Sequence, residues 1–510
     1  MPIEAHSFEL VKESEEVVKA ALNAGNLDQI LGTELTVADG YVLCAMAETF
    51  WKDWVREFPD YRQGAEVGKE VLLVGGISAA FRGFLSQSGV AFALRSRSVL
   101  EKLGYGVGVL EAGAGISRRG TQQPLAFSVD AVRKYLEVQA AREPARILPK
   151  GDSHPEDLQS GYDFVHWFNH GVGPSLRNRY GRVVHGFDGT VIPVCFENEN
   201  YEGSGVRRKD NEWARGYKLG LLKSYLDEAE VISGMELGPI QRHDVVLGRR
   251  LLLETPVLKK GDLLIYDRGL MCPLLLSDLK ELRGVDVIVP VREDMHLLKD
   301  AVALAKVFEA EASQRGESIW NHHPFREGEQ IVLLKDLRES WANCQVDING
   351  ALVRYRNKEG ALEYVLFVST DLTLTAAQIL RTYQLRVEIE EDNRQIKRSW
   401  EILEFTATSL IYIVFHIVIT LTAYTLFLYY NGTKTGRQFS KRTIQKAKRE
   451  EEGDKNIRII LVACGHFVIL RPVELVLWIL DVPEEARKKL KGIIAPWIRD
   501  TSDLWPFEFR

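Results

Sequence analysis

The chain has 510 residues, more than one ordinary domain holds, so we expect two to four domains. Its composition, with 45% hydrophobic and 27% charged residues, is that of a globular protein and excludes an intrinsically disordered chain. The net charge of −6 argues against a general polyanion binder, so binding to nucleic acid would depend on local basic patches.

The cysteines and the first residues indicate the cellular compartment. The five cysteines are scattered, odd in number and form no CxxC pair. This pattern argues against a disulfide framework or a zinc site and favours a reducing environment. The start, MPIEAHSFEL, has neither a basic nor an apolar stretch, so we expect no signal peptide and a cytoplasmic location.

Residues 1–155 are predicted to form a helical N-terminal domain. Apolar residues recur at helical spacing in 40–58 and again in 128–141. Residues 142–157, REPARILPKGDSHPED, interrupt every periodicity with prolines, a glycine and charges, and are predicted to be a linker.

Residues 156–296 change to a mixed pattern. Short β-branched runs predict strands at 181–196, 216–226 and 229–237, the first with a turn at Asp188-Gly189. A helix at 242–255, a strand ending at Asp267, a helix at 272–284 and a strand at 285–293 follow. Three strands, then a helix, strand, helix and strand are typical of a ribonuclease-H-like α/β sheet, in which strand one lies beside strand four.

Residues 297–371 are predicted to be a β-rich insertion. The runs 329–337, 343–350, 351–357 and 363–370 have strand character and are separated by polar turns, including NG and KEG. We expect the last strand to return to the main sheet. Residues 372–430 then resume the core, where Thr375–Gln378 fits a capping box that starts a helix containing residues 383–400.

This helix has two different polar faces. At about 100° per residue, one arc of about 60° contains Tyr383, Arg386, Glu390 and Lys397. Glu388 and Asp392 fall on the opposite side. The first face is suited to cradle a phosphodiester, with cations holding the backbone and Glu390 left to bind metal. On this helix alone, a solvated face with pairs such as Glu390 and Arg394 is the favoured interpretation.

Three carboxylates are predicted to meet in one site. Asp188 and Asp267 are expected to end neighbouring strands, and Gly189 and Gly269 beside them would let a ligand approach the backbone. Glu390, on a helix across the sheet, would be the third acid. Three crowded carboxylates repel one another unless cations neutralise them, and Mg²⁺ prefers such oxygen ligands. Two ions at this place can activate water or a 3′-hydroxyl and stabilise a leaving oxygen. For either aspartate alone, an ordinary turn residue is the favoured interpretation, so the prediction depends on their joint placement.

The motifs resemble those of one protein family. The spacing Tyr383-x2-Arg386-x3-Glu390-x6-Lys397 resembles the Tyr-Arg-Glu-Lys signature of DDE transposases of the insertion-sequence-four family. HGFDGTVIP (185–193) and LLIYDRG (263–269) are similar to that family's two aspartate segments, and QRHD (241–244) also fits. The resemblance covers about residues 180–430.

The resemblance implies a ribonuclease-H-like core that carries a β insertion. It also implies site roles: Asp188, Asp267 and Glu390 would bind metal, and Tyr383, Arg386 and Lys397 would contact DNA phosphates near the cut. The implied protein is a DNA transposase with two Mg²⁺ or Mn²⁺ ions. It would hydrolyse phosphodiesters at the element's ends and join the freed 3′-hydroxyl to target DNA.

The expected partners are the terminal repeats and target DNA, bound by a homodimer. Residues 1–155 would bind the DNA ends, and residues 431–510 would serve DNA contact or dimerisation. Two alternatives stay open. One is a metal nuclease of the same fold without strand transfer, and the other is a catalytically dead DNA-binding derivative.

A basic run and an apolar run follow the signature helix. Residues 434–449 contain seven Lys or Arg and no acid. They fit either a solvated basic surface or a DNA-backbone contact through Lys441, Arg442, Lys446 and Lys448. Residues 409–430 carry no Asp, Glu, Lys or Arg and are long enough to span a membrane. We favour a buried core helix, packed under the sheet as in the family, because the segment stands alone and contains Ser, Thr and His.

Two histidines and two tryptophans in segment 297–371 are weaker candidates for functional residues. His322-His323 fit a loop better than a metal site, because no further ligand has helical spacing to them. Trp320 and Trp341 lie in the predicted insertion, where core packing is favoured over stacking on a DNA base.

Overall fold

The computed structural model describes residues 160–433, apart from 178–179, 210–211 and 228, and shorter stretches at both ends. Those stretches are 12–31, 45, 49, 51–63, 65, 68–82, 85–87, 90, 115–116, 122–123, 129–143, 459–464, 466–470, 478, 481–486 and 488–490. The chain forms two compact units. Unit 1 comprises residues 1–143, 399–407 and 411–510, and unit 2 comprises 144–398 and 408–410. The domain boundaries predicted from the sequence stay predictions, and most of the predicted linker lies outside the described residues.

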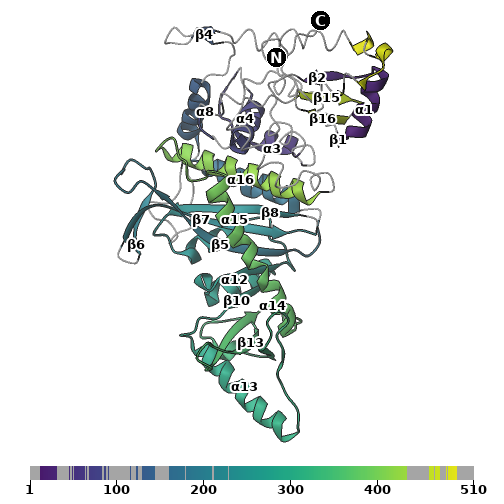
Figure 1. Cartoon of the computed structure of the whole chain (residues 1–510). Coiled ribbons are helices and arrows are strands. Elements are labelled where there is room, and N and C mark those ends of the chain that lie inside the picture. The colour runs from purple at the N-terminus through teal and green to yellow at the C-terminus, as the bar shows by residue number, and fades with distance from the viewer. Residues whose placement is uncertain are drawn as a thin grey trace. The chain divides into compact units, whose positions relative to one another are not determined.

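Unit 2 contains a mixed sheet of ten strands (Figure 1). These are β5 (Val184–Val194), β6 (Gly205–Lys209), β7 (Glu212–Tyr225), β8 (Glu230–Pro239), β9 (Leu263–Tyr266), β10 (Asp286–Pro290), β11 (Asn321–His322), β12 (Gln330–Leu334), β13 (Asn349–Arg356) and β14 (Leu362–Ser369). The order is β11-β12-β13-β14-β10-β9-β5-β7-β6, and β8 also pairs with β7. β9 pairs in parallel with both β5 and β10, while the other pairs are antiparallel. The prediction that strand one lies beside strand four is confirmed, and this order is consistent with a ribonuclease-H-like fold.

Helices cover both faces of this sheet. They are α9 (Tyr162–Trp167), η1 (Phe168–Val172), α10 (Gly173–Arg177), α11 (Asp244–Glu254), η2 (Arg268–Leu270), α12 (Pro273–Arg283), α13 (His296–Gln314), η3 (Arg338–Ser340), α14 (Ala376–Gln384) and α15 (Arg386–Ser399). Apolar residues of α11, α12 and α13 share one core with strand residues such as Phe187 and Leu264. Ile379 and Leu380 of α14 pack with Leu263 and other strand residues in a separate core. Because side chains alternate along a strand, Phe187 and Asp188 face opposite sides of the sheet.

The segment 297–371 differs from its prediction in two ways. It begins with the 19-residue helix α13, which was not predicted within this β-rich insertion although Leu297, Ala301 and Ala305 recur at helical spacing. The predicted strand at 343–350 is wrong: only its last two residues, Asn349 and Gly350, are extended, and they open β13 instead of forming a hairpin turn. The last strand does return to the main sheet, because β14 pairs antiparallel with β10.

Unit 1 combines elements from distant parts of the chain. Its described elements are β1 (Lys12–Glu13), α1 (Glu15–Ala24), β2 (Gln29–Leu31), α3 (Trp51–Glu57), α4 (Lys69–Arg82), β3 (Gly115–Ile116), β4 (Gln122–Gln123), α8 (Val129–Arg142), most of α16 (Leu410–Gly432), β15 (Ile459–Ala463) and β16 (His466–Leu470). A four-stranded sheet in the order β1-β16-β15-β2 joins N-terminal and C-terminal strands. Within residues 1–155, the described elements are thus the helices α1, α3, α4 and α8 together with four strands of two or three residues, and the helical N-terminal domain stays a prediction.

The apolar helix α16 has the contacts of a core helix within unit 1. It is the one helix among the described residues that is long and apolar enough to cross a membrane, and 94% of its apolar stretch is buried. Gly76 of α4 approaches Ile419 so closely that an added Cβ would lie 3.1 Å from its Cγ2. His416 bonds to the carbonyl oxygens of Leu85 and Glu401, at 3.0 and 3.1 Å. A single helix with such burial is weak evidence for a membrane span.

Candidate active site

Asp188 and Asp267 lie at adjacent positions on neighbouring strands. Phe187 and Tyr266 are the last residue pair of the parallel ladder between β5 and β9, and each aspartate directly follows one of them. The prediction that Asp188 ends its strand at a turn is wrong. β5 continues to Val194, because β7 runs along its whole length and supplies ladder hydrogen bonds beyond the end of β9. The two aspartates therefore meet where β9 stops and β5 continues.

The two glycines beside the aspartates have different surroundings. A Cβ at Gly189 would lie 2.6 Å from Oδ1 of Asp244, the first residue of α11, which also pairs with Lys218 at 3.0 Å. No atom lies within 4 Å of the corresponding position at Gly269. Close approach of a ligand to the backbone is therefore open at Gly269, whereas at Gly189 the space is taken by Asp244.

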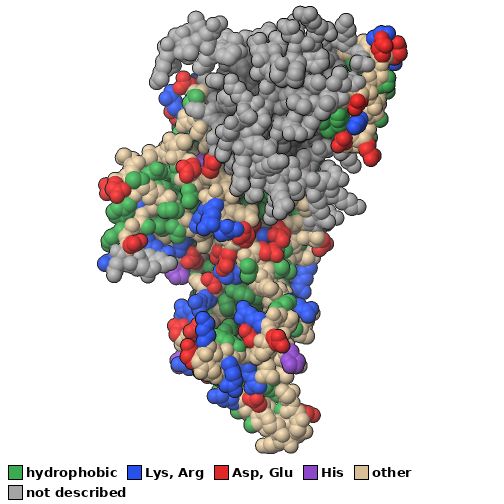
Figure 2. Space-filling view, viewed as in Figure 1, with side chains coloured by type: hydrophobic (Ala, Val, Ile, Leu, Met, Phe, Trp, Pro, Cys, Tyr) green, Lys and Arg blue, Asp and Glu red, His purple; other side chains and the backbone are tan. Residues whose placement is uncertain are grey.

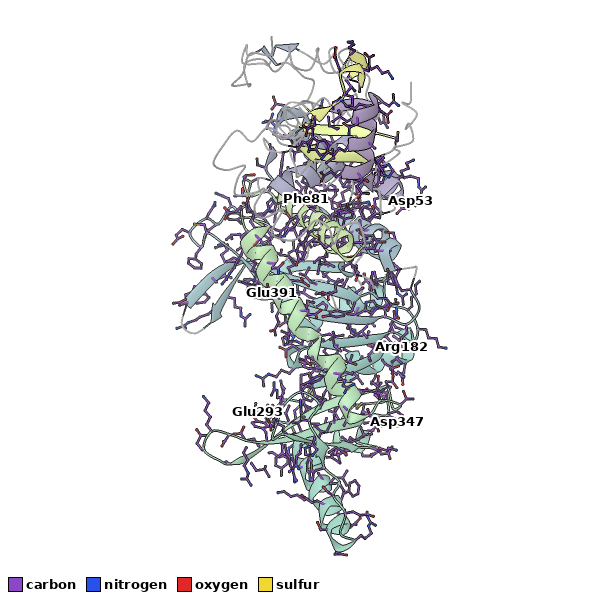
Figure 3. All side chains as sticks on the ribbon, turned by 45° about the vertical axis from the view of Figure 1, so that its right-hand side comes forward. Asp53, Phe81, Arg182, Glu293, Asp347 and Glu391 are labelled. Carbon is purple, nitrogen blue, oxygen red and sulfur yellow. The ribbon has the colours of Figure 1, made fainter. Side chains whose placement is uncertain are left out.

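The predicted signature helix is two helices with a break. The capping box of Thr375 and Gln378 starts α14, as predicted. The helix is interrupted at Leu385, whose carbonyl oxygen accepts a hydrogen bond of 2.6 Å from the Tyr225 hydroxyl on β7. A side chain that enters the helical hydrogen-bond ladder in this way is a common cause of a break. α15 then runs diagonally across the strands of unit 2, as Figure 3 shows beside the labelled Glu391.

The guanidinium of Arg386 lies between the three predicted acids. Its Nη2 is 3.6 Å from Asp188 Oδ1 and 3.5 Å from Asp267 Oδ2. Its Nη1 donates a hydrogen bond of 2.6 Å to Glu390 Oε1. The carboxylates of Asp188 on β5, Asp267 directly after β9 and Glu390 on α15 thus lie around one guanidinium. The meeting of the three acids was predicted, whereas the position of Arg386 among them was not.

The acids fit a divalent metal by their chemistry. Burial raises the pKa of Asp188 to about 6; Arg386 acts to lower it, and Asp267 and Glu390 raise it further. Such crowding of acids favours a bound cation. In the described part of the chain no three His, Cys, Asp or Glu side chains are arranged to hold a metal ion, and the Arg386 guanidinium lies among these three acids. Three carboxylates nevertheless match the oxygen ligands that Mg²⁺ and Mn²⁺ take.

Two further residues of α15 belong to this face. Asn393 donates a hydrogen bond of 2.8 Å from Nδ2 to Asp188 Oδ2. Burial lowers the pKa of Lys397, and Asp188 acts in the opposite direction. Asn393 was not predicted as a site residue, although the helical angle that selected Glu390 places this amide only about 60° away on the same face.

Tyr383 lies beside the acids and lines a pocket. Its ring is 4.9 Å from that of Phe367 on β14, and burial is the main cause that raises its pKa to about 12. The pocket, with a volume of about 410 Å³, is also lined by Arg386, Tyr355 and Phe325. Space large enough for part of a ligand therefore lies next to the cluster of acids, against the strands of segment 297–371.

The opposite face of α15 is held by a buried lysine. Lys223 of β7 is 1% exposed, and its Nζ lies 2.6 Å from both Asp392 and Glu230 and 3.9 Å from Glu388. The pKa of Glu388 is raised to about 7, first by burial and then by its hydrogen bond to Glu230. Glu388 and Asp392 thus face away from the Arg386 cluster, as predicted. Lys223 was not predicted as a functional residue, and its signal in the sequence is a lysine within an apolar strand that also contains Lys218.

Of the remaining predicted residues, His323 lines the same pocket as Tyr383. Lys441, Arg442, Lys446 and Lys448 fall outside the described residues. Trp320 and Trp341 are buried core residues, and Arg354 lies over the Trp320 ring at 3.9 Å. His323 accepts backbone hydrogen bonds from Phe325 and Arg326, which fits the predicted loop role. Figure 2 shows acidic and basic side chains interspersed over unit 2, with Lys and Arg gathered over segment 297–371.

The fold is that of a mixed α/β protein. Two of the clustered acids, Asp188 and Asp267, lie where the pairing of the neighbouring strands β5 and β9 ends. Residues 180–426 match the family model described as transposase DDE domain. This match supports a DDE transposase, a class with polynucleotidyl transferase or nuclease activity that acts on DNA in transposition and generally uses divalent metal ions. No curated protein matches the chain.

Proposed function

We propose that the chain is a transposase of the insertion-sequence-four family that cuts DNA at the ends of its element and joins the freed 3′-hydroxyl to target DNA. The observation that carries this proposal is the convergence of Asp188, Asp267 and Glu390 on the Arg386 guanidinium. The spacing of Tyr383, Arg386, Glu390 and Lys397 supports the assignment to this family.

Asp188, Asp267 and Glu390 would hold two Mg²⁺ or Mn²⁺ ions. When bound, these ions supply an activated water or 3′-hydroxyl and stabilise the leaving oxygen of the phosphodiester. The three carboxylates are separated widely in the chain but lie within hydrogen-bonding or ion-pair distance of one guanidinium. A divalent cation bound at this place would be held by these three carboxylates.

The cationic residues of the same face would hold the DNA backbone. Arg386 neutralises the acids in the structure and is suited to bind a phosphate with its planar guanidinium. Lys397, two turns beyond Glu390 on α15, would contact a neighbouring phosphate. The Tyr383 hydroxyl, beside Arg386, would donate a hydrogen bond to the same backbone. These contacts orient the phosphodiester without reading its sequence.

Two ends of one element are processed in a transposition event, so we expect two copies of the chain in the DNA complex. Residues 1–155 are proposed to bind the DNA ends, and residues 431–510 to serve DNA contact or dimerisation. We expect the protein to act in the cytoplasm, in line with the burial of α16.

The test is incubation of the full-length protein with DNA that carries the element's ends, together with target DNA and Mg²⁺. We expect cleaved ends with 3′-hydroxyls and joined products, and loss of both when EDTA removes the metal. Mn²⁺ should restore them. Cleavage without any joined product would instead support a metal nuclease. Binding without cleavage by the unmodified protein would support a dead DNA-binding derivative.

A second prediction concerns the basic run 434–449. Replacing Lys441, Arg442, Lys446 and Lys448 by Gln should weaken DNA binding similarly for all sequences. The slope of log affinity against log salt should become shallower by up to about 0.9 for each lost phosphate contact. Fluorescence anisotropy over a salt series measures this. Exchanging Lys for Arg, and Arg for Lys, at the same four positions is the control and should keep the slope. An unchanged slope in the Gln variant would make the run a solvated surface.

A further inference from the structure

We propose that Asn393 is a positioning residue of the candidate active site, which fixes the Asp188 carboxylate so that one oxygen faces the metal position. The inference rests on the proposed function, because it assigns Asp188 to a metal-binding set. It concerns a residue outside the four-residue signature of α15.

The two oxygens of Asp188 have different partners. Asn393 Nδ2 donates to Oδ2 at 2.8 Å, across 205 positions of sequence. Oδ1 instead faces Arg386 Nη2 at 3.6 Å, the same nitrogen that lies 3.5 Å from Asp267 Oδ2. The hydrogen bond of Asn393 therefore determines which oxygen of Asp188 points to the place where the acids converge.

The chemistry of an amide suits this role. Asn393 presents its N–H to the carboxylate, and the flipped amide would place two acceptor oxygens against each other. An apolar residue here would leave Asp188 Oδ2 without this donor, at a side chain that is only 17% exposed. Of the polar side chains on α15, Asn393 is thus placed to hold Asp188 without adding charge to a crowded set of acids.

The rest of the amide supports the same conclusion. Asn393 is 7% exposed, and its Oδ1 is a buried acceptor without a hydrogen-bond partner among the described residues. Buried acceptors are normally paired. Of the two polar atoms of this amide, only Nδ2 has a hydrogen-bond partner within the described part of the chain, and that partner is Asp188. We infer that the contact with Asp188 determines the position of Asn393.

Residues that orient metal-binding side chains typically change metal affinity by about 10–100-fold when they are replaced. The expected effect of losing Asn393 is thus a weaker metal site, with the acids themselves intact. DNA binding without metal should be unaffected, because Asn393 is buried and carries no charge for a phosphate.

The experiment measures Mn²⁺ binding by electron paramagnetic resonance, with the full-length protein bound to uncleaved DNA. Asn393→Ala removes the amide, and Asn393→Leu removes it while keeping a side chain of similar size. We expect about 10–100-fold weaker Mn²⁺ binding in both. In the cleavage assay, the Mn²⁺ concentration for half-maximal rate should rise, and saturating Mn²⁺ should recover most of the rate.

Gln395→Ala is the matched control. Gln395 is an amide on the same helix, and its Nε2 donates to Glu391, an acid outside the cluster. This variant should bind Mn²⁺ like the unmodified protein. Circular dichroism and thermal melting establish that each variant is folded.

Wild-type Mn²⁺ affinity in a folded Asn393→Leu or Asn393→Ala variant would overturn the inference. Asp188→Asn separates this result from failure of the proposed function. If Asp188→Asn abolishes Mn²⁺ binding while Asn393→Leu does not change it, the metal site stands and only the role of Asn393 falls. If Mn²⁺ binding does not depend on Asp188, both proposals are overturned.

Discussion

Glu390→Gln should abolish DNA cleavage, whereas Glu388→Gln should keep near wild-type activity. Glu390 contacts Arg386 within the cluster of acids, and Gln keeps its shape but loses the charge that a metal ligand set needs. Glu388 faces Lys223 and Glu230 on the other side of α15. Because burial and Glu230 raise its pKa to about 7, a neutral Gln resembles a form that Glu388 already populates at neutral pH.

The comparison is a cleavage assay at matched protein concentration, with binding to uncleaved DNA measured alongside. Asp188→Ala and Asp267→Ala should also abolish cleavage while DNA binding persists. Arg386→Ala should weaken DNA positioning and leave some residual cutting. Equal loss of activity in Glu390→Gln and Glu388→Gln would contradict the helical-face assignment and the signature match.

The raised pKa of Glu388 also determines how its contribution to stability depends on pH. A group whose pKa is higher in the folded protein stabilises the fold fully below its unfolded value, 4.5 here, and loses this contribution as pH rises through about 7. Glu388→Gln should therefore melt like the unmodified protein in mild acid and gain relative stability above pH 7. Denaturation at pH 5 and pH 8 measures the difference.

Lys223→Met should destabilise the protein strongly. Lys223 is buried, and its ammonium is the cation shared by Glu230, Glu388 and Asp392. Removing one partner from a buried charge network typically costs about 3–5 kcal/mol, because the remaining charges lose their compensation. The free energy of unfolding from a urea titration measures this loss. We also expect reduced cleavage, because the ion pairs of Lys223 hold the face of α15 that lies opposite Glu390.

Lys488→Met is the control for this result. Lys488 also pairs with two acids, Glu484 and Glu485, but all three side chains are largely exposed. Its replacement should cost less than about 1 kcal/mol. A similar small cost for Lys223→Met would show that the buried network does not stabilise α15.

The part of the fold that follows local rules was predictable. The residue pattern predicts the strands and the capping box at Thr375. The order of elements along the chain predicts that β5 and β9 are neighbours in the sheet. The continuation of β5 through Asp188-Gly189 was not predictable, because whether an Asp-Gly pair forms a turn depends on its partner strand, and β7 pairs with β5 past this point without interruption. The pairing of β1 and β2 with β15 and β16 joins segments more than 400 residues apart, which no local periodicity contains.

The candidate site was predictable in outline. Helical spacing placed Glu390 with Arg386, and the strand order placed Asp188 with Asp267. The break at Leu385 depends on the hydroxyl of Tyr225 from another element. Asn393 and Lys223 were missed for a similar reason: their roles follow from contacts with strands, while their own local patterns are those of an ordinary helix and strand.

The pairing of β14 with β10 bears on how such a protein changes during evolution. Segment 297–371 lengthens the main sheet at its edge and shares an apolar core with it, since Leu352 and Val368 lie in the same core as Phe187. Excising the segment would bare the edge of β10 and remove about half of that core, so we expect the remaining sheet to lose stability. Length variation among descendants should concentrate at the exposed turn 357–361, where the β13–β14 hairpin ends in solvent.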